Sequence, residues 1–202
     1  MKLIHPLNQL RYLKNTVHTF YGHGTRAWII FFYYGLFRIN KFRILQADLV
    51  NLADTPVELD EVAYFIPTIN ELDVLRTNKD LPREFFCDKF QKVKTCCVAK
   101  VQDELAYIHW IYFKGDFSRF LKIDVNSAEI NYVITRPEFR GKNISAGAFK
   151  FTIQQLRSQG IKYLYAVAHD ENIASIKSFL RAGFVDIGCT YSLGHFNFKT
   201  KV

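Results

Sequence analysis

The sequence predicts an α/β protein of the α+β kind, in which helices cover a mixed sheet and a helical extension precedes it. Residues 128–192 alternate strand-like and helix-like patterns in the order strand–helix–strand–helix–strand. A two-strand hairpin pattern at 96–113 precedes them. The chain has 202 residues, of which 49% are hydrophobic, so it can bury the core of one domain with an appendage.

The first half of the chain is expected to be mostly helical. Apolar residues recur at helical spacing over residues 6–22, and the glycines that follow end that helix. A second helix is expected from a cap at Thr25 to Ile39, although its aromatic and β-branched content also suits a strand. The further expected elements are a strand at 42–49, a turn at 55–56 and helices at 69–75 and 81–92.

The second half gives clearer patterns. Hairpin strands at 96–101 and 105–113 flank a turn, and a strand at 128–135 ends before Pro137. A helix then runs from 143 to 158, with Gly160 as its stop. Asp170 is expected to cap the next helix, whose apolar side holds Ile173, Ile176 and Leu180 and which ends at Gly183. The remaining strands are expected at 163–168, 185–192 and 195–199.

The basic charge is concentrated in the first 47 residues. This segment holds seven of the 27 Lys and Arg residues and none of the 19 acidic residues, so the remainder is nearly neutral. A basic protein often binds nucleic acid, but here the excess belongs to one terminal segment, and we expect no specific nucleic-acid partner. We therefore divide the chain into a basic, aromatic-rich helical extension at 1–40 and a domain at 41–202.

Cysteine and histidine spacing argues against a metal site. The four cysteines form no CxxC pair, and the histidines show no HxH or HExxH spacing. We interpret the cysteines as reduced, partly buried thiols of a cytoplasmic protein. The longest apolar stretch, residues 27–37, is far shorter than the ~20 residues of a membrane span, and we see no signal peptide.

The most informative segment is residues 133–146. A strand stops at Pro137, a short loop follows, and Arg140 and Gly141 precede a helix. The start of a helix presents unpaired N–H groups and partial positive charge, which favour phosphate, and Gly141 allows close backbone approach. The alternative interpretation is an ordinary loop at the start of a helix.

This segment resembles the acyl-CoA loop of the GNAT-type N-acetyltransferase superfamily, whose pattern is Arg/Gln-x-x-Gly-x-Gly/Ala. Residues 161–167 look like the family's fifth strand, and 172–184 look like its closing helix with an Ala-Gly-Phe ending. The resemblance implies a central twisted, mostly antiparallel sheet with helices on both faces. Three positions depart from the pattern: Asn143 and Ser145 replace small residues, and Phe179 replaces a tyrosine thought to protonate the departing thiolate.

The resemblance also implies a donor site for acetyl-CoA. The backbone of Val133, Ile134 and Thr135 would pair with the pantetheine arm, and an N–H, that of Ile134, would polarise the thioester carbonyl. Asn172 and Ser175 would contact the cofactor arm. The amides that would hold the pyrophosphate belong to Arg140, Gly141, Lys142, Asn143, Ile144 and Ser145.

The reaction implied is direct attack of an amine on the thioester, and the amine must be neutral. We name Glu129 as the candidate base, because strand alternation places Glu129, Asn131, Val133 and Thr135 on one face. The alternative for Glu129 is a solvated carboxylate at a strand end. The proton donor for the thiolate stays open among Tyr132, Tyr191, His109 and His169.

Three interpretations of residues 1–40 remain open: a helical appendage that packs on the domain or a second subunit, a peripheral anchor on an anionic membrane, and a lid over the acceptor. A loose likeness to GNAT proteins of surface-polysaccharide pathways favours an amino-sugar acceptor. We therefore expect an N-acetyltransferase acting on a small amine. The alternatives are a protein N-acyltransferase and a non-catalytic acyl-CoA-binding module.

Overall fold

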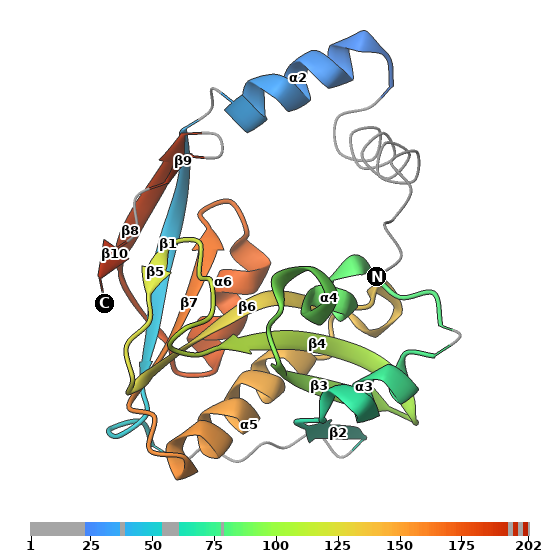
Figure 1. Ribbon diagram of the computed structural model, residues 1–202, viewed down its shortest axis with the longest axis vertical. Helices are drawn as coiled ribbons and strands as arrows, with labels where there is room; N and C mark the ends of the chain where they lie inside the picture. The colour runs from blue at the N-terminus through green and yellow to red at the C-terminus, as the bar shows by residue number, and fades with distance from the viewer. Residues whose placement is uncertain are drawn as a thin grey trace. The chain divides into compact units, whose positions relative to one another are not determined.

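The computed structural model describes residues 23–36, 39–53, 61–77, 79–193, 196–197 and 200–201 (Figure 1). The chain divides into two units, which we describe separately. The larger comprises residues 42–190 and 199–202, and the smaller comprises 1–41 and 191–198. The helix expected at 6–22 and the turn expected at 55–56 lie outside the described residues.

A mixed sheet forms the centre of the larger unit, which confirms the predicted fold class. Its strand order is β2-β3-β4-β6-β7-β1-β8, and β6 and β7 run parallel, whereas β2/β3, β3/β4, β4/β6 and β7/β1 are antiparallel. The strands are β1 (Ile39–Asp48), β2 (Val62–Phe65), β3 (Thr95–Val101), β4 (Glu104–Tyr112), β6 (Ser127–Thr135), β7 (Tyr163–His169) and β8 (Val185–Leu193). The short β5 (Leu121–Lys122) pairs in parallel with β10 (Thr200–Lys201).

The helices form two separate apolar clusters on the sheet. Residues of α5 (Ile144–Ser158) and α6 (Ile173–Arg181) pack in one cluster with the sheet. Residues of α3 (Ile69–Leu75), the 3-10 turn η1 (Arg83–Phe86) and α4 (Cys87–Gln91) pack in the other. The expected helix at 81–92 is thus broken, because Phe86 has φ −120° and ψ 23°, outside the helical range.

The hairpin turn and most helix ends follow the sequence patterns. Gln102 and Asp103 both have positive φ, as a two-residue turn between β3 and β4 requires. Thr68 and Glu71 form a reciprocal capping box at the start of α3. The helix α5 covers the predicted range, and Gly160 follows it with φ 80°.

The predicted cap of α6 is wrong. The helix begins at Ile173, and its cap is Asn172, whose Oδ1 accepts from Ser175 N at 3.2 Å. Asp170 instead accepts from Arg43 Nε at 2.6 Å, because that guanidinium lies on the neighbouring β1. The apolar side also differs: Ile176 and Phe179 are buried, whereas the exposed fractions of Ile173 and Leu180 are 51% and 47%.

A β-bulge in β6 shapes the region around the site. Tyr132 has φ 48°, and the β4–β6 register shifts so that Tyr132 and Val133 together stand opposite His109. The pairing of β6 with β7 runs only from Ser127 to Ile130. Beyond the bulge, therefore, β6 is paired with β4 on one edge, and its other edge is not paired with β7.

The bulge also makes the predicted shared face of β6 wrong. Glu129 stands opposite Tyr112, which packs with α4 and η1, whereas Thr135 stands opposite Tyr107, which packs with α5. Val133 packs on the same side as Thr135. One extra residue in the strand reverses the alternation, so Glu129 and Val133 face opposite sides of the sheet.

The smaller unit contains α2 (Thr25–Leu36) and β9 (Phe196–Asn197), which pairs with the end of β8. Residues 25–36 are therefore helical, and Ile39 begins β1 and does not end the helix. Within the strand expected at 195–199, the structure describes only β9, and β10 lies beyond the expected range. Among the helices that the structure describes, none is long and apolar enough to cross a membrane.

Candidate functional site

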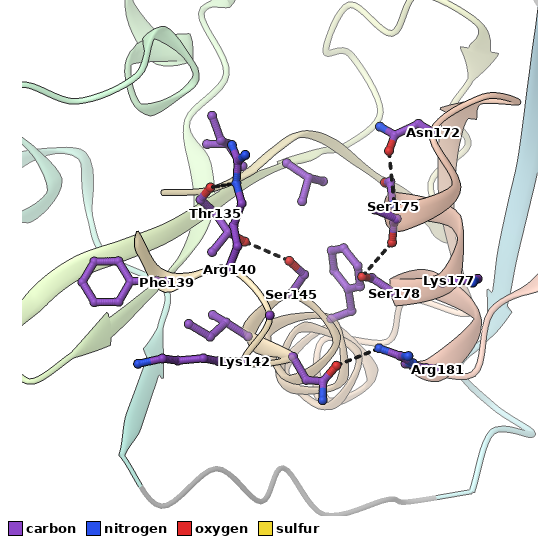
Figure 2. Close-up of a pocket in the computed structure, with 17 residues that line it drawn as sticks. Thr135, Phe139, Arg140, Lys142, Ser145, Asn172, Ser175, Lys177, Ser178 and Arg181 are labelled. Carbon is purple, nitrogen blue, oxygen red and sulfur yellow. Dashed lines mark hydrogen bonds between the residues drawn. The ribbon is translucent and has the colours of Figure 1, made fainter. Parts of the chain in front are cut away.

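A cavity of about 400 Å³ lies in the larger unit, between the free edge of β6, the loop at 136–143, the start of α5 and one side of α6 (Figure 2). All eleven residues that the sequence suggested for donor binding line it, although their role stays a prediction. The lining consists of Val133, Ile134, Thr135, Phe139, Arg140, Gly141, Lys142, Asn143, Ile144, Ser145, Phe149, Asn172, Ala174, Ser175, Lys177, Ser178 and Arg181.

The β6 edge directs alternate backbone groups into this cavity. Arg136 N donates to Ala106 O of β4 at 2.9 Å. Backbone groups alternate in direction along a strand, so the N–H of Ile134, two residues earlier, also points towards β4. Thr135 and Val133 then direct their N–H groups away from β4. The contact from Arg140 Nε to Thr135 O, at 3.1 Å, agrees with this direction, because Arg140 lines the cavity.

The loop between β6 and α5 is held in an unusual backbone conformation. Pro137 begins a 3-10 turn, η2 (Pro137–Phe139), and Gly141 and Asn143 follow with φ 81° and 56°. A Cβ at Gly141 would meet nothing within 4 Å, so there is room for a side chain. The positive φ is therefore the reason that glycine is favoured at this position. Asn143 replaces the family's glycine with one of the side-chain types that best tolerate the left-handed region.

The start of α5 presents its backbone donors to the cavity. Asn143 precedes the helix but makes no side-chain capping bond, and the first described intrahelical bond runs from Gly147 N to Asn143 O at 3.2 Å. The N–H groups of Ile144 and Ser145 therefore precede the helical ladder and border the cavity. A 15-residue helix adds partial positive charge at this end.

Three side-chain contacts tie the walls of the cavity together, and Figure 2 draws them. Arg140 is bonded to Thr135, as above, and the hydroxyls of Thr135 and Ser145 lie 3.1 Å apart. Arg181 Nη1 on α6 donates to Asn143 Oδ1 at 2.7 Å. The strand edge, the loop and α6 are thus linked before any ligand is present.

The electrostatics of the cavity favour an anion. Arg140, Lys142, Lys177 and Arg181 line it, and the described lining contains no Asp or Glu. The positive end of α5 adds to these four side chains. An extended ligand with phosphate groups fits this donor set, whereas a cationic ligand would be repelled.

Glu129 does not line the cavity. It is 1% exposed and lies on the other face of the sheet, where Asn131 Nδ2 donates to its Oε1 at 3.4 Å. Tyr112 on β4 and Tyr165 on β7 stand directly opposite it in register. The role of Glu129 as the base therefore stays a prediction, and it applies to an acceptor on this second face.

The four candidate proton donors differ in their surroundings. His109 is fully buried, with ring nitrogens 2.9 Å from Tyr107 Oη and 3.1 Å from Thr152 Oγ1, and burial lowers its pKa to about 3. Gln91 Nε2 donates to Tyr132 Oη at 3.0 Å, and burial raises the pKa of Tyr132. His169 Nδ1 accepts from Glu171 N at 3.2 Å, and Tyr191 is in the smaller unit.

Phe179, at the position of the family's acid, belongs to the core. It is 2% exposed and stacks on Phe149 with ring centres 4.1 Å apart and planes at 6°. Phe184 completes the aromatic group at 5.0 Å from Phe179. These contacts account for a phenylalanine here by packing, since an aromatic ring without a hydroxyl needs no polar partner when buried.

The part of α6 that follows Ser175 also lines the cavity and was not predicted from the sequence. Lys177, Ser178 and Arg181 line it, and their spacing of three and four residues places them on neighbouring rows of one helix. The signal was present in the sequence, since Asn172 and Ser175 were already assigned to this wall. The charged residues on the same side were the natural continuation of it.

No group of three or more His, Cys, Asp or Glu side chains in the described parts of the chain is arranged to hold a metal ion. The three cysteines in the larger unit's core, at 87, 96 and 97, are free and buried. Burial raises the pKa of Cys87 and Cys97 to about 12, so neither thiol is a reactive thiolate.

The comparisons with known proteins agree with this geometry. The model of the acetyltransferase (GNAT) family matches residues 66–184, more than half of the chain, and the chain therefore belongs to this family. This confirms the resemblance seen in the sequence, and the acyltransferase class that we predicted is that of the family. A comparison with curated proteins finds no match.

Solved structures share the fold at low sequence identity. A GNAT-family protein from Novosphingobium aromaticivorans has 15% identity and a TM-score of 0.52, covering 76% of this chain and 63% of its own. One from Colwellia psychrerythraea has 14% and 0.54, covering 83% and 61%. The glucosamine N-acetyltransferase region of a fungal multi-domain β-N-acetylglucosaminidase has 17% and 0.59, covering 82% and 22%. This chain thus spans less than two thirds of each of these proteins.

Proposed function

We propose that this protein is an N-acetyltransferase that transfers the acetyl group of acetyl-CoA to the amine of a small molecule. The observation that carries the proposal is the free edge of β6, which lies beside the positive start of α5 in one cavity. An extended amide-containing arm suits the strand edge, and a pyrophosphate suits the helix start. Acetyl-CoA contains both groups in sequence.

The backbone of β6 supplies the donor for the thioester. The thioester carbonyl gains negative charge during attack, and a fixed N–H group stabilises that charge. Strand parity favours the N–H groups of Val133 and Thr135 over that of Ile134, whose N–H points towards β4. We therefore assign the thioester to Val133 and the pantetheine arm to Thr135, with Ile134 as the alternative donor.

The loop and α6 orient the rest of the donor. The amides from Arg140 to Ser145 bind the pyrophosphate, and the side chains of Arg140 and Lys142 neutralise its charge. Asn172 and Ser175 lie at the N-terminal end of α6 and contact the pantetheine arm. The nucleophile is the amine itself, so the protein needs to hold the two substrates together and remove one proton.

The leaving group needs little help. A free thiol has a pKa near ~8.5, so a thiolate departs tolerably well without an acid, and Phe179 does not preclude transfer. The base is the more demanding role. Glu129 is our candidate, since its carboxylate lies next to the bulge on the face opposite the donor cavity.

The first experiment measures donor binding and thiol release together. Calorimetry should detect CoA binding, and free thiol should appear from acetyl-CoA in the presence of an acceptor amine. The amine panel should include amino sugars and their nucleotide derivatives, because we favour such an acceptor and the fungal structural neighbour acts on glucosamine. CoA binding without thiol release for any amine would favour a non-catalytic acyl-CoA-binding module.

A second experiment tests Glu129. We expect Glu129→Gln to lower the rate, most strongly at low pH, while CoA affinity stays similar, because the amide keeps the shape but cannot accept a proton. Asn131→Ala is the matched control, since it removes the hydrogen bond to Glu129 and leaves the carboxylate in place. A wild-type pH–rate profile for Glu129→Gln would remove this residue as the base.

The smaller unit suggests where the enzyme works. Ile29, Phe32 and Tyr33 of α2 are exposed and follow the i, i+3, i+4 spacing of one helix face, within a segment that carries only basic charge. We propose that this segment contacts anionic membrane at the cytoplasmic face. The intact protein should pellet with anionic vesicles, and Ile29→Ser/Phe32→Ser should not. Failure of the intact protein to pellet would contradict this.

A further inference from the structure

Glu129 lies between two groups of aromatic side chains on the second face of the sheet. On one side stands Tyr112 of β4, which packs in the apolar cluster with η1 and α4. On the other side stands Tyr165 of β7, which packs in a separate cluster with Phe120. Side chains in direct register point to the same face of a sheet, so the two aromatic groups flank this carboxylate.

Each aromatic group carries an arginine. Arg83 of η1 has its Cζ 4.4 Å from the ring centre of Phe90, and Arg119, in the loop between β4 and β5, has its Cζ 4.7 Å from that of Phe120. Stacking on a ring orients a guanidinium and leaves the N–H groups along its edge able to bind an anion. Both arginines are exposed, whereas Glu129 is 1% exposed. A buried carboxylate is therefore flanked by two cations at the surface.

The two arginines act on one tyrosine. Burial raises the pKa of Tyr132, and the positive charges of Arg83 and Arg119 act in the opposite direction. Tyr132 also packs edge-on against Phe90, with ring centres 5.9 Å apart. Burial lowers the pKa of Arg119, so this guanidinium is partly removed from water, where an anion stabilises a cation most. Both cations thus lie around the bulge, on the face that holds the candidate base.

A buried hydroxyl beside Glu129 points to a polar ligand. Tyr112 is 1% exposed, and its Oη has no hydrogen-bond partner among the residues that the structure describes. Such a hydroxyl costs about 1–3 kcal/mol. Burial raises its pKa, and the charges of Glu129 and Asp116 raise it further, so both acids lie near it. Asp116 accepts from Phe113 N at 2.9 Å within its own loop, whereas an amine that reached Glu129 would give Tyr112 Oη a partner.

The buried acid and the exposed cations together define the acceptor. A carboxylate attracts an amine, and guanidinium groups bind phosphate or carboxylate. We propose that the acceptor carries an anionic group, a phosphate or a carboxylate, which binds Arg119 and Arg83 while its amine reaches Glu129. The inference rests on the proposed function and deepens it, because it favours zwitterionic amines over amines that lack an anionic group.

The test compares matched acceptors in the thiol-release assay with acetyl-CoA. Glucosamine and glucosamine 6-phosphate differ by a phosphate, and ethanolamine and glycine differ by a carboxylate. We expect kcat/KM to be about tenfold higher for the anionic member of at least one pair, the effect of one charge-assisted contact. A preference in the first pair alone would identify a phosphate, and one in the second pair alone would identify a carboxylate.

Variants of the two arginines test where the anionic group binds. Arg119→Gln should lower kcat/KM for the anionic acceptor about tenfold, mainly through KM, and leave the neutral acceptor and CoA affinity unchanged. Arg83→Gln should have the same selectivity with a smaller loss. Arg119→Lys should restore part of the preference, because it keeps the charge without the planar fork. Lys114→Gln is the control, since it removes an exposed cation from the same loop, and it should keep the full preference.

The outcomes separate the acceptor from the activity. Equal kcat/KM within both pairs, or thiol release only from amines without an anionic group, would overturn the anionic acceptor and leave the proposed function intact. An Arg119→Gln variant that loses the same factor with both members of a pair would also overturn it. Thiol release from no amine at all would instead overturn the proposed function, and the acceptor inference with it.

Discussion

The two halves of β6 differ in their neighbouring strands and in their burial. Residues 127–130 have β4 on one edge and β7 on the other and are buried. Residues 131–135 keep β4 alone, are half-buried, and the last three line the cavity. A single extra residue at Tyr132 separates the halves. A bulge thus converts a core strand into a strand edge that can bind a ligand.

Hydrogen bonds on both faces of the sheet support the bulge. His109, opposite the bulge, bonds to Thr152 of α5 across the apolar cluster. On the other face, Asn131 Oδ1 accepts from Tyr132 N at 3.1 Å, and Asn131 Nδ2 donates to Glu129. The left-handed residue is therefore supported by its own neighbours, as strained positions near functional sites usually are.

The largest expected effect comes from the loop that closes the open half. Gly141→Pro should weaken CoA binding about a hundredfold, because proline fixes φ near −65° and Gly141 has φ 81°. Gly141→Ala should cost roughly 1 kcal/mol, or about fivefold. Calorimetry measures both.

Gly160 provides a matched control for that loop. It has φ 80°, and a Cβ there also meets nothing within 4 Å, but it lies at the far end of α5. Gly160→Ala should therefore lower the unfolding free energy by the same amount without changing CoA affinity. A loss of CoA affinity in Gly160→Ala as large as that in Gly141→Ala would mean that both act through general stability.

A smaller effect is expected from Arg140→Ala, which removes a cation and its bond to Thr135 O. We expect about a tenfold loss of CoA affinity, in the range of one charge-assisted contact. Arg136→Ala is the control in the same loop, since Arg136 pairs with Glu104 and Glu138 and does not line the cavity. Equal losses of CoA affinity in the two variants would contradict a specific contact between Arg140 and the phosphate.

The stability of the protein should depend on pH through His109, which lies on β4 opposite the bulge. Burial lowers its pKa from 6.5 to about 3, so between these values the unfolded chain binds a proton that the folded chain does not. Stability from this residue is present above pH 6.5 and falls as the pH falls, by about 1.4 kcal/mol per unit. Urea unfolding between pH 4.5 and 6.5 measures the slope, and His109→Gln should flatten it. An unchanged slope would contradict the assignment.

The smallest effect is expected at Asn143. Asn143→Gly restores the family's residue, relieves the left-handed strain and loses the contact with Arg181. These effects oppose one another, so CoA affinity should change less than about twofold. A tenfold loss would show that the link to Arg181 holds the loop, and that the backbone conformation alone does not.

The sequence could predict what depends on local pattern. The Arg140–Gly141 loop, the helix behind it and the hairpin at 96–113 follow from spacing and turn chemistry. The family was identified from the resemblance of this loop and of residues 161–167 and 172–184. It could not predict the bulge, because Tyr132 is no signal for a positive φ and the shift depends on pairing with β4. The face of Glu129 was therefore misassigned.

Other errors have the same origin in contacts between distant segments. Asp170 is a good capping residue, but Arg43, 127 positions away, engages it, and Asn172 takes its place. The side of α6 that carries Lys177 and Arg181 became significant only when the helix was seen to border the loop at Asn143.

The most direct test of donor binding by β6 is residue-resolved amide hydrogen exchange with and without CoA. We predict that the Ile134 amide is protected in the free protein, because it faces β4, and that CoA newly protects the amides of Thr135 and Val133 on the open edge. Unchanged exchange of the Thr135 and Val133 amides on addition of CoA would contradict the claim that these two N–H groups on the free half of β6 bind the donor.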